Sequence, residues 1–383
     1  MPKEWYDCGC QRGAARFFGP GEFGLGVIRF NRRLSLTVVT LATGLALVVA
    51  GAGAVLAQQS AGTFLLKWGS FGSGDGQLFF PFAVTADNSG DVYVAERGNH
   101  RIQKFTASGE FITKWGSQGA ADGQFDSPRG IVVDGSGNVY VSDSDNARVQ
   151  KFTASGEFIT KWGSQGAGDG QFDTPRGLAV DESGNVYVAD LLNHRVQKFT
   201  ASGEFITKWG SQGSGDGQFT FPKGIGIDSV GNVYVTDEID RVQKFTASGD
   251  FITKWGSQGS GDGQFDSPSD VTVDSADKVY VVDNINSRVQ KFTASGGFIT
   301  KWGSQGSGDG QFNAPVSVAA DKSGSLYVTD QSNHRIQKFA SGEAAPTPTP
   351  VPVMGLPALG ALAALLVASA GWGVRRRWAL SAI

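Results

Sequence analysis

The sequence predicts an all-β fold: a six-bladed β-propeller of four-stranded blades, closed by its N-terminal strand, with a hydrophobic helix towards each end of the chain. Tryptophans of a recurring KWG element follow one another at intervals of 47, 47, 47, 46 and 47 residues, and tyrosines of a VYV or LYV element keep the same spacing. Six copies of a strand-rich unit of this length are typical of a propeller rather than a helical solenoid. The two sets are Trp68, Trp115, Trp162, Trp209, Trp255 and Trp302, and Tyr93, Tyr140, Tyr187, Tyr234, Tyr280 and Tyr327.

The copy at 125–162 divides into four short strands separated by turns. PRGIVVD (128–134) is rich in β-branched residues, and NVYVSD (138–143) alternates between two faces. RVQKFTA (148–154) and EFITKWG (157–163) follow after further turns. Four antiparallel strands joined by tight turns form one propeller blade.

A glycine-rich loop after each KWG carries the chain inward to the next blade. Its glycines permit the positive φ angles that such a crossing needs. We expect the aromatic residue that ends the loop to wedge between neighbouring blades. These residues are Phe125, Phe172, Phe219, Phe265 and Phe312.

The two ends of the array predict how the ring closes. The first copy begins with a fourth strand alone, TFLLKWG (63–69), and the last copy, at 312–339, has only the first three strands. We therefore expect the N-terminal strand to complete the last blade, which leaves no open sheet edge between the ends.

Composition argues against several classes of protein. A net charge of -3 and a pI near 5.7 give no electrostatic reason to expect a nucleic-acid partner. Both cysteines, Cys8 and Cys10, precede the repeats. The repeats therefore have no disulfide framework, no CxxC pair and no cysteine zinc site.

The N-terminal part of the chain predicts export. Residues 1–57 form an extension whose uncharged run, 34–57, is either a signal peptide cleaved after Ala57 or an uncleaved signal anchor. Under both alternatives the propeller, 58–342, lies outside the cytoplasm.

The C-terminal part predicts attachment to the membrane. A Pro/Thr-rich linker (343–352) precedes a second uncharged run (353–374), which is long enough to cross a bilayer as a helix. The basic tail, 375–383, is then expected on the cytoplasmic side. Alternatively, LPALG (356–360) resembles part of a bacterial sorting signal, although it lacks the threonine. The expected location is the cell membrane or cell surface.

Residues 70–342 resemble the NHL-repeat family of six-bladed propellers, in the form exported to prokaryotic surfaces. Most copies carry a Pro before the first strand, VYV-x-D on the second and Asn-His-Arg before the third. The resemblance implies the fold but not the function, because one such fold hosts binding, scaffolding and enzymatic roles. The Asn-His-Arg motif stands at 99–101, 193–195 and 333–335, in weaker form at 146–148 and 286–288, and is shortened at 240–241.

The three histidines of the chain, His100, His194 and His334, fall in equivalent turns of blades one, three and six. We expect these turns to lie far apart, whereas zinc ligands converge to about 2 Å from the metal. Amidating lyases related to NHL propellers hold zinc with histidines, some placed just after the Pro that opens the innermost strand. The equivalent residues here include no histidine, so we expect no metal and no cofactor. They are Phe82, Arg129, Arg176, Lys223, Ser269 and Val316.

An acidic residue follows the VYV element in every blade. These carboxylates could form a calcium or catalytic ring, or each could accept hydrogen bonds from its own turn and pair with the Arg that follows. Their presence in every blade favours the structural interpretation. The residues are Glu96, Asp143, Asp190, Asp237, Asp283 and Asp330.

One face of the predicted propeller varies between copies, and the other is uniform. The turns between second and third strands differ, as do the residues after the opening Pro, whereas TASGEF or TASGDF recurs on the opposite face. Varied positions can recognise a ligand, although drift would also scatter differences. The candidate ligand-binding residues are therefore the same six, Phe82, Arg129, Arg176, Lys223, Ser269 and Val316, of which three consecutive cations suit an anionic group.

These observations predict a non-enzymatic binding module at the cell surface, with a protein or a polysaccharide as its partner. The competing hypothesis is a propeller enzyme of the lactonase or lyase type that uses a channel metal.

Overall fold

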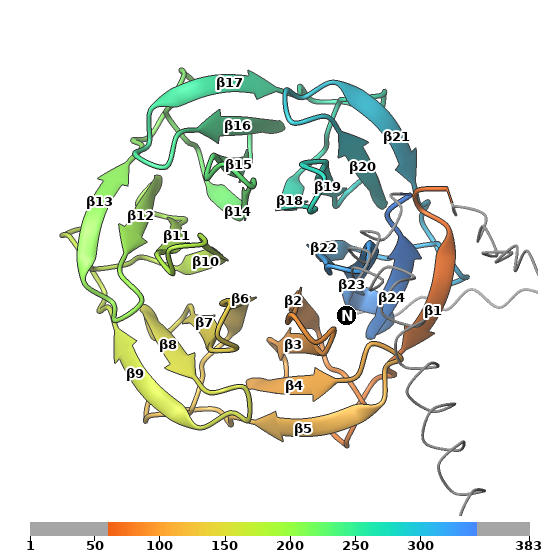
Figure 1. The fold of residues 1–383 in the computed structure, drawn as a ribbon, viewed down its shortest axis with the longest axis horizontal. Coiled ribbons are helices and arrows are strands. Elements are labelled where there is room, and N and C mark those ends of the chain that lie inside the picture. The colour runs from red at the N-terminus through yellow and green to blue at the C-terminus, as the bar shows by residue number, and fades with distance from the viewer. Residues whose placement is uncertain (1–59, 343–383) are drawn as a thin grey trace, which may run out of the picture. The chain divides into compact units, whose positions relative to one another are not determined.

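A computed structural model describes residues 60–342, which form six four-stranded antiparallel sheets arranged in a ring around a central channel (Figure 1). In every sheet the strands lie in chain order from the channel outwards, except that the sixth sheet is completed by β1. The predicted fold class is confirmed. The two predicted apolar segments, 34–57 and 353–374, lie outside the described residues, and within 60–342 no helix is long and apolar enough to span a membrane.

The first three blades follow one another without interruption. Blade 1 contains β2 (Pro81–Ala86), β3 (Val92–Glu96), β4 (Arg101–Phe105) and β5 (Phe111–Trp115). Blade 2 contains β6 (Pro128–Val133), β7 (Val139–Asp143), β8 (Arg148–Phe152) and β9 (Phe158–Trp162). Blade 3 contains β10 (Pro175–Val180), β11 (Val186–Asp190), β12 (Arg195–Phe199) and β13 (Phe205–Trp209).

The other three blades complete the ring. Blade 4 contains β14 (Pro222–Ile227), β15 (Val233–Asp237), β16 (Arg241–Phe245) and β17 (Phe251–Trp255). Blade 5 contains β18 (Pro268–Val273), β19 (Val279–Asp283), β20 (Arg288–Phe292) and β21 (Phe298–Trp302). Blade 6 contains β22 (Pro315–Ala320), β23 (Ser325–Asp330), the short 3-10 helix η1 (Gln331–Asn333), β24 (Arg335–Ala340) and β1 (Phe64–Trp68).

The strands differ in burial because of their distance from the rim. Every residue of β7 is buried, since both faces of a second strand pack against neighbouring blades. The outermost β9 alternates between half-buried and exposed residues because its outer face meets solvent. The predicted wedge is also confirmed: Phe125 is fully buried and packs with residues of blades 1 and 2.

Closure follows the sequence prediction. β1 pairs antiparallel with β24, which places Lys67 opposite Gln337 and Trp68 opposite Ile336. The Trp68 ring also reaches across the seam between blades, with centroids 6.1 Å from Tyr327 and 5.8 Å from Phe105. Strand β1 thus joins blade 6 to blade 1.

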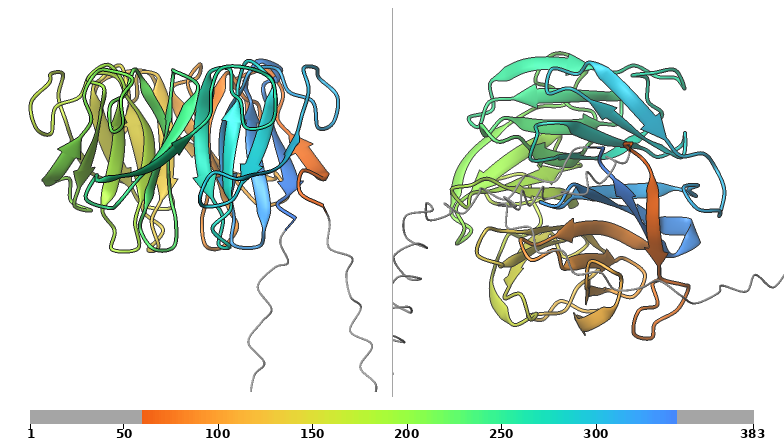
Figure 2. Two further views of the ribbon diagram at one scale, coloured as in Figure 1. Left: turned by 90° about the horizontal axis from the view of Figure 1, so that it is seen from above. Right: turned by 45° about the vertical axis from the view of Figure 1, so that its right-hand side comes forward.

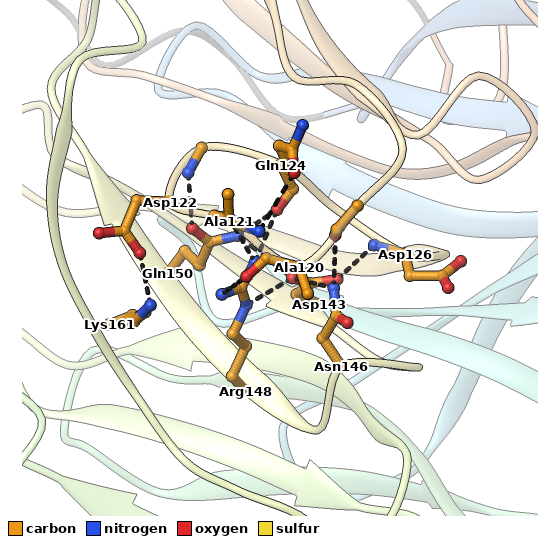
Figure 3. A network of polar contacts seen from close by, with 12 residues as sticks. Ala120, Ala121, Asp122, Gln124, Asp126, Asp143, Asn146, Arg148, Gln150 and Lys161 are labelled. Atoms are coloured by element: carbon orange, nitrogen blue, oxygen red, sulfur yellow. Dashed lines mark hydrogen bonds and ion pairs between the residues drawn. The ribbon is translucent and has the colours of Figure 1, made fainter.

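The acidic residue after the VYV element is a structural hub, as blade 2 illustrates (Figure 3). Asp143 is fully buried and accepts hydrogen bonds from the Asp126 backbone N–H (2.6 Å) and the Arg148 Nε (2.7 Å). Arg148 in turn donates to the carbonyls of Ala120 and Gln124 in the crossing loop. The network ties the second strand to the incoming loop, and the structural interpretation is confirmed.

The ring has two distinct faces (Figure 2). We call the face that carries the loops between blades and the turns between second and third strands the crossing face. There the Arg97 N–H donates to the Phe80 carbonyl (3.1 Å). We call the opposite face, which carries the other turns, the hairpin face. Both ends of the described chain lie on it, since the Gly62 N–H donates to the Ala340 carbonyl and the Ser341 N–H donates to the Gly324 carbonyl.

Candidate ligand-binding mouth of the central channel

The structure brings all six candidate positions together at the crossing-face mouth of the channel. Each lies directly after the Pro that begins an innermost strand. They line one cavity of about 380 Å³, together with Ser267 of a crossing loop and side chains from the turns between second and third strands. The lining comprises Phe82, Arg97, Arg129, Arg176, Lys223, Ser267, Ser269, Asn284, Val316 and Gln331.

A β-bulge places these side chains at the mouth. In blade 2, Pro128 pairs with Asp143 and Gly130 with Ser142, and the register shifts between them. Arg129 is therefore left out of the ladder, and a bulge of this kind re-aims the side chain of the unpaired residue. The same shift follows the opening Pro of all six innermost strands.

Close approach of neighbouring innermost strands holds the basic residues side by side. A Cβ on Gly130 would lie 2.0 Å from the Arg176 carbonyl oxygen, and a Cβ on Gly177 would lie 2.3 Å from the Lys223 carbonyl oxygen. Any side chain at these two positions would push the strands apart. Glycine thus sets the spacing between Arg129, Arg176 and Lys223 around the mouth.

Arg176 reaches across the channel. Its guanidinium carbon lies 5.0 Å from the centroid of the Phe82 ring, although the two residues belong to blades 3 and 1. Burial lowers the pKa of Arg176 to about 10, the Asp270 carboxylate opposes this shift, and the Arg129 and Arg97 charges add to it. Arg176 stays protonated at neutral pH, partly desolvated and stacked on an aromatic face, a favourable state for a cation.

The neighbouring cations have carboxylate partners at the rim. Arg129 Nη2 lies 3.4 Å from Asp145 Oδ1, and the Lys223 Nζ contacts Glu238 Oε2 and donates to Ser267 Oγ (2.8 Å). Burial and the nearby Arg176 charge lower the pKa of Lys223 to about 7. The Asp240 and Asp237 carboxylates oppose that shift because they favour the charged ammonium.

Asp270 lies deeper in the channel and was not anticipated from the sequence. Its carboxylate accepts hydrogen bonds from Ser317 Oγ (2.7 Å), from the Val318 N–H (3.1 Å) and from its neighbour Val271 (2.9 Å). Burial raises its pKa to about 6 despite these bonds and the Arg176 charge. The sequence signal was a lone Asp at a position where blades 2, 3 and 4 carry glycine.

A cluster of aromatic side chains adjoins the mouth at the seam between blades 6 and 1. We call Phe71, Phe79, Phe80 and His334 the aromatic patch. Phe71 packs edge-on against Phe79 at 5.3 Å and lies 5.1 Å from His334, while Phe80 lies 5.3 Å from His334. Phe71 is 65% and Phe80 39% exposed. The repeat pattern of the sequence does not indicate this patch.

The histidines do not converge, as expected. His100 Nδ1 accepts from the Ser127 N–H (3.2 Å), His334 Nδ1 accepts from the Phe80 N–H (3.4 Å), and His194 contacts the Thr220 carbonyl. Each histidine thus contacts the crossing loop that enters the next blade. Across residues 60–342 there is no group of three or more His, Cys, Asp or Glu side chains that could hold a metal ion.

Comparison with known proteins identifies the repeats. A family model described as NHL repeat matches residues 80–105, 125–152, 172–199, 265–292 and 312–339. The fourth copy, with the one-residue deletion before Arg241, is not among these segments. Among curated proteins, no sequence matches the chain.

Solved structures share the fold at low sequence identity. A structural genomics protein of unknown function from Bacteroides thetaiotaomicron is 20% identical, with a TM-score of 0.55 over 71% of this chain and 74% of that one. A streptogramin B lyase is 13% identical, with a TM-score of 0.52 over 73% and 99%. A catalytically inactive virginiamycin B lyase from Staphylococcus aureus, with quinupristin, is 16% identical, with a TM-score of 0.50 over 71% and 86%. At these identities the similarity concerns the fold alone.

Proposed function

This chain is an NHL-repeat six-bladed β-propeller, and we propose that it is a non-enzymatic binding module that takes an anionic ligand, a protein or a glycan, at the crossing-face mouth of its channel. The observation that carries the proposal is the cluster of Arg97, Arg129, Arg176 and Lys223 around one cavity. Such a cluster raises the local concentration of anions, and its contacts strengthen where water is partly excluded.

The state of the cations supports binding rather than a purely structural role. Buried cations are costly unless they are well paired. Here the 3.4 Å contact between Arg129 and Asp145 is long, and the carboxylates of Asp145 and Glu238 are 43% and 40% exposed. An incoming anion could therefore displace them, and its charge would offset the burial and the repulsion from Arg129 and Arg97 that lower the pKa of Arg176.

We further propose that the chain is exported and held at the cell membrane by its C-terminal segment. Both ends of the described chain lie on the hairpin face. Anchoring through either end would then direct the crossing face, with its cationic mouth, away from the bilayer. Protease added to intact cells should remove the propeller, and full protection of an epitope at Ser341 would contradict the proposed export of the propeller.

Replacement of the three inner-strand cations tests the binding proposal. Arg129→Ser, Arg176→Ser and Lys223→Ser together should weaken binding of acidic peptides and acidic glycans at least tenfold on a surface array, because hydrogen bonds to charged groups contribute about 1.5–3 kcal/mol each. Serine stands at this position in blade 5, as Ser269, so the variant should fold.

A matched variant on the hairpin face supplies the control. Glu110→Ser, Glu157→Ser and Glu204→Ser alter three equivalent exposed residues and should leave binding unchanged. Equal affinity of the two triple variants would remove the case for the mouth. Turnover of a lactone or a streptogramin by the metal-loaded chain would instead favour the competing enzyme hypothesis.

A further inference from the structure

The crossing loop that enters blade 1 departs from the other five in its aromatic content. Phe71 pairs with Leu78 in a short bridge, and the equivalent bridges all begin with a glutamine. Phe80 occupies a position that is small or polar in four of the other five loops. The equivalents of Phe71 are Gln118, Gln165, Gln212, Gln258 and Gln305, and those of Phe80 are Ser127, Thr174, Phe221, Ser267 and Ala314.

Packing leaves part of both aromatic side chains open to solvent. Phe71 and Phe80 are among the large apolar side chains that the structure leaves exposed. Phe80 also has a φ of 48°, in the left-handed region that bulky residues rarely adopt. Four other loops share this conformation, with φ between 52° and 59°, and three of them carry a small Ser or Ala there. A strained and exposed aromatic residue marks a position kept for contact with a partner.

The aromatic patch is linked to the cationic mouth through the strand start that carries Phe80 and Phe82. The Phe80 carbonyl accepts a hydrogen bond from the Arg97 N–H (3.1 Å). Two residues further on, Phe82 carries the Arg176 guanidinium on its ring. The backbone thus links the exposed Phe80 to Arg97 and Phe82, both of which line the cavity with Arg129, Arg176 and Lys223. The far side of the cavity is lined by neutral hydrogen-bonding side chains, Ser267, Asn284 and Gln331.

These three kinds of surface match one kind of ligand unit. A hexuronate residue combines a carboxylate, several hydroxyls and an apolar ring face in one rigid body. Aromatic rings bury apolar area against such a face, cations hold the carboxylate, and neutral polar side chains bond to hydroxyls. An acidic peptide carries its carboxylates on flexible arms and has no hydroxyl-rich unit to match the neutral side of the mouth.

We propose that the ligand of this mouth is an acidic polysaccharide, with uronate rings packed on Phe71 and Phe80 and carboxylates held by the cationic arc. This inference rests on the proposed anion-binding function and adds the chemical class of the ligand. On this proposal the aromatic patch distinguishes uronate rings from other anions, whereas the cations bind any anionic group.

Calorimetric titration of the full chain tests the assignment with three probes. These are a hexagalacturonate, the same oligomer with its carboxyls reduced to alcohols, and a glutamate hexapeptide. The variant Phe71→Gln/Phe80→Ser gives both positions the residues that other loops carry, and it should melt no lower than the wild type. Its affinity for hexagalacturonate should fall roughly tenfold, since two aromatic contacts are lost. Its affinity for the glutamate peptide should stay within about twofold.

A control variant removes two exposed apolar side chains elsewhere. Ile112→Gln/Ile159→Ser changes the outer strands, where the side chains are 44% and 45% exposed, and should leave hexagalacturonate binding intact. The reduced oligomer should not bind.

Two results would overturn the inference: hexagalacturonate fails to bind the wild type, or binds both proteins equally. If hexagalacturonate fails to bind but the glutamate peptide binds and depends on Arg129, Arg176 and Lys223, the proposed function stands and the ligand is an acidic peptide. If hexagalacturonate binds both proteins equally, the proposed function stands but the aromatic patch has no part in recognition. If none of the anionic probes binds, both proposals fail.

Discussion

Truncation of Trp68 tests whether the N-terminal strand holds the ring closed in solution. Trp68 in β1 packs between Tyr327 of blade 6 and Phe105 of blade 1, at 6.1 and 5.8 Å. Trp162 in β9 packs between Tyr140 and Phe199 of blades 2 and 3, at 6.2 and 5.9 Å. The two tryptophans thus occupy equivalent sites, one at the closure and one inside the continuous chain.

The expected cost follows from this packing. Truncation of a buried Trp to Ala destabilises a protein by about 3–5 kcal/mol. Both tryptophans are half-buried, so the lower end, about 3 kcal/mol, applies to each. For a domain of this size, each kcal/mol lowers the melting temperature by about 2–4 °C, which gives a decrease of roughly 6–12 °C.

Thermal unfolding of the full chain, followed by near-ultraviolet circular dichroism, would compare Trp68→Ala with Trp162→Ala. We expect the two melting temperatures to agree within about 2 °C. If Trp162→Ala melts well below the wild type and Trp68→Ala does not, β1 is not docked on β24, and closure by the N-terminal strand is wrong.

Two further predictions concern the channel. Gly130→Ala should lower the melting temperature and weaken binding of acidic probes, because the added methyl meets the Arg176 carbonyl at 2.0 Å. Gly135→Ala, with open space around the added methyl, should change neither. A Gly130→Ala protein with unchanged melting temperature and binding would contradict the close approach of the innermost strands. Asp270→Asn should stabilise the protein more at pH 7 than at pH 4. The raised pKa means that ionisation of Asp270 costs stability, and this cost is absent below about pH 4 and complete above about pH 6. If wild type and Asp270→Asn differ in melting temperature by the same amount at pH 4 and pH 7, the prediction is refuted.

The repeat made the fold predictable because every copy carries the same pattern of strand-forming and turn-forming residues. Strand β7 was expected at 138–143 and lies at Val139–Asp143, and the wedge at Phe125 followed from its place after the glycines. Closure could be inferred because the two incomplete copies complement each other. Six repetitions removed the ambiguity that a single short apolar run leaves between helix and strand.

The site was predictable only in part. The opening Pro marked the six lining positions, but the β-bulge that turns them into the mouth depends on pairing with the next strand. The contact between Arg176 and Phe82 joins blades 3 and 1, and no local pattern encodes a reach of that kind. Asp270 and Phe71 were missed because no other copy carries the same residue at either position, and the aromatic residue at Phe80 recurs only as Phe221.

Closure by β1 also allows two molecules to exchange their closing strands. The closing strand, FLLKW, resembles the FITKW strands of the other blades, and a glycine-rich loop joins it to β2. When two chains fold close together, the β1 of one can pair with the β24 of the other and satisfy the same hydrogen bonds. Such domain swapping costs little where the exchanged element is identical and its hinge is flexible. Refolding at high concentration should therefore yield linked rings, and dilution during folding should favour the single ring.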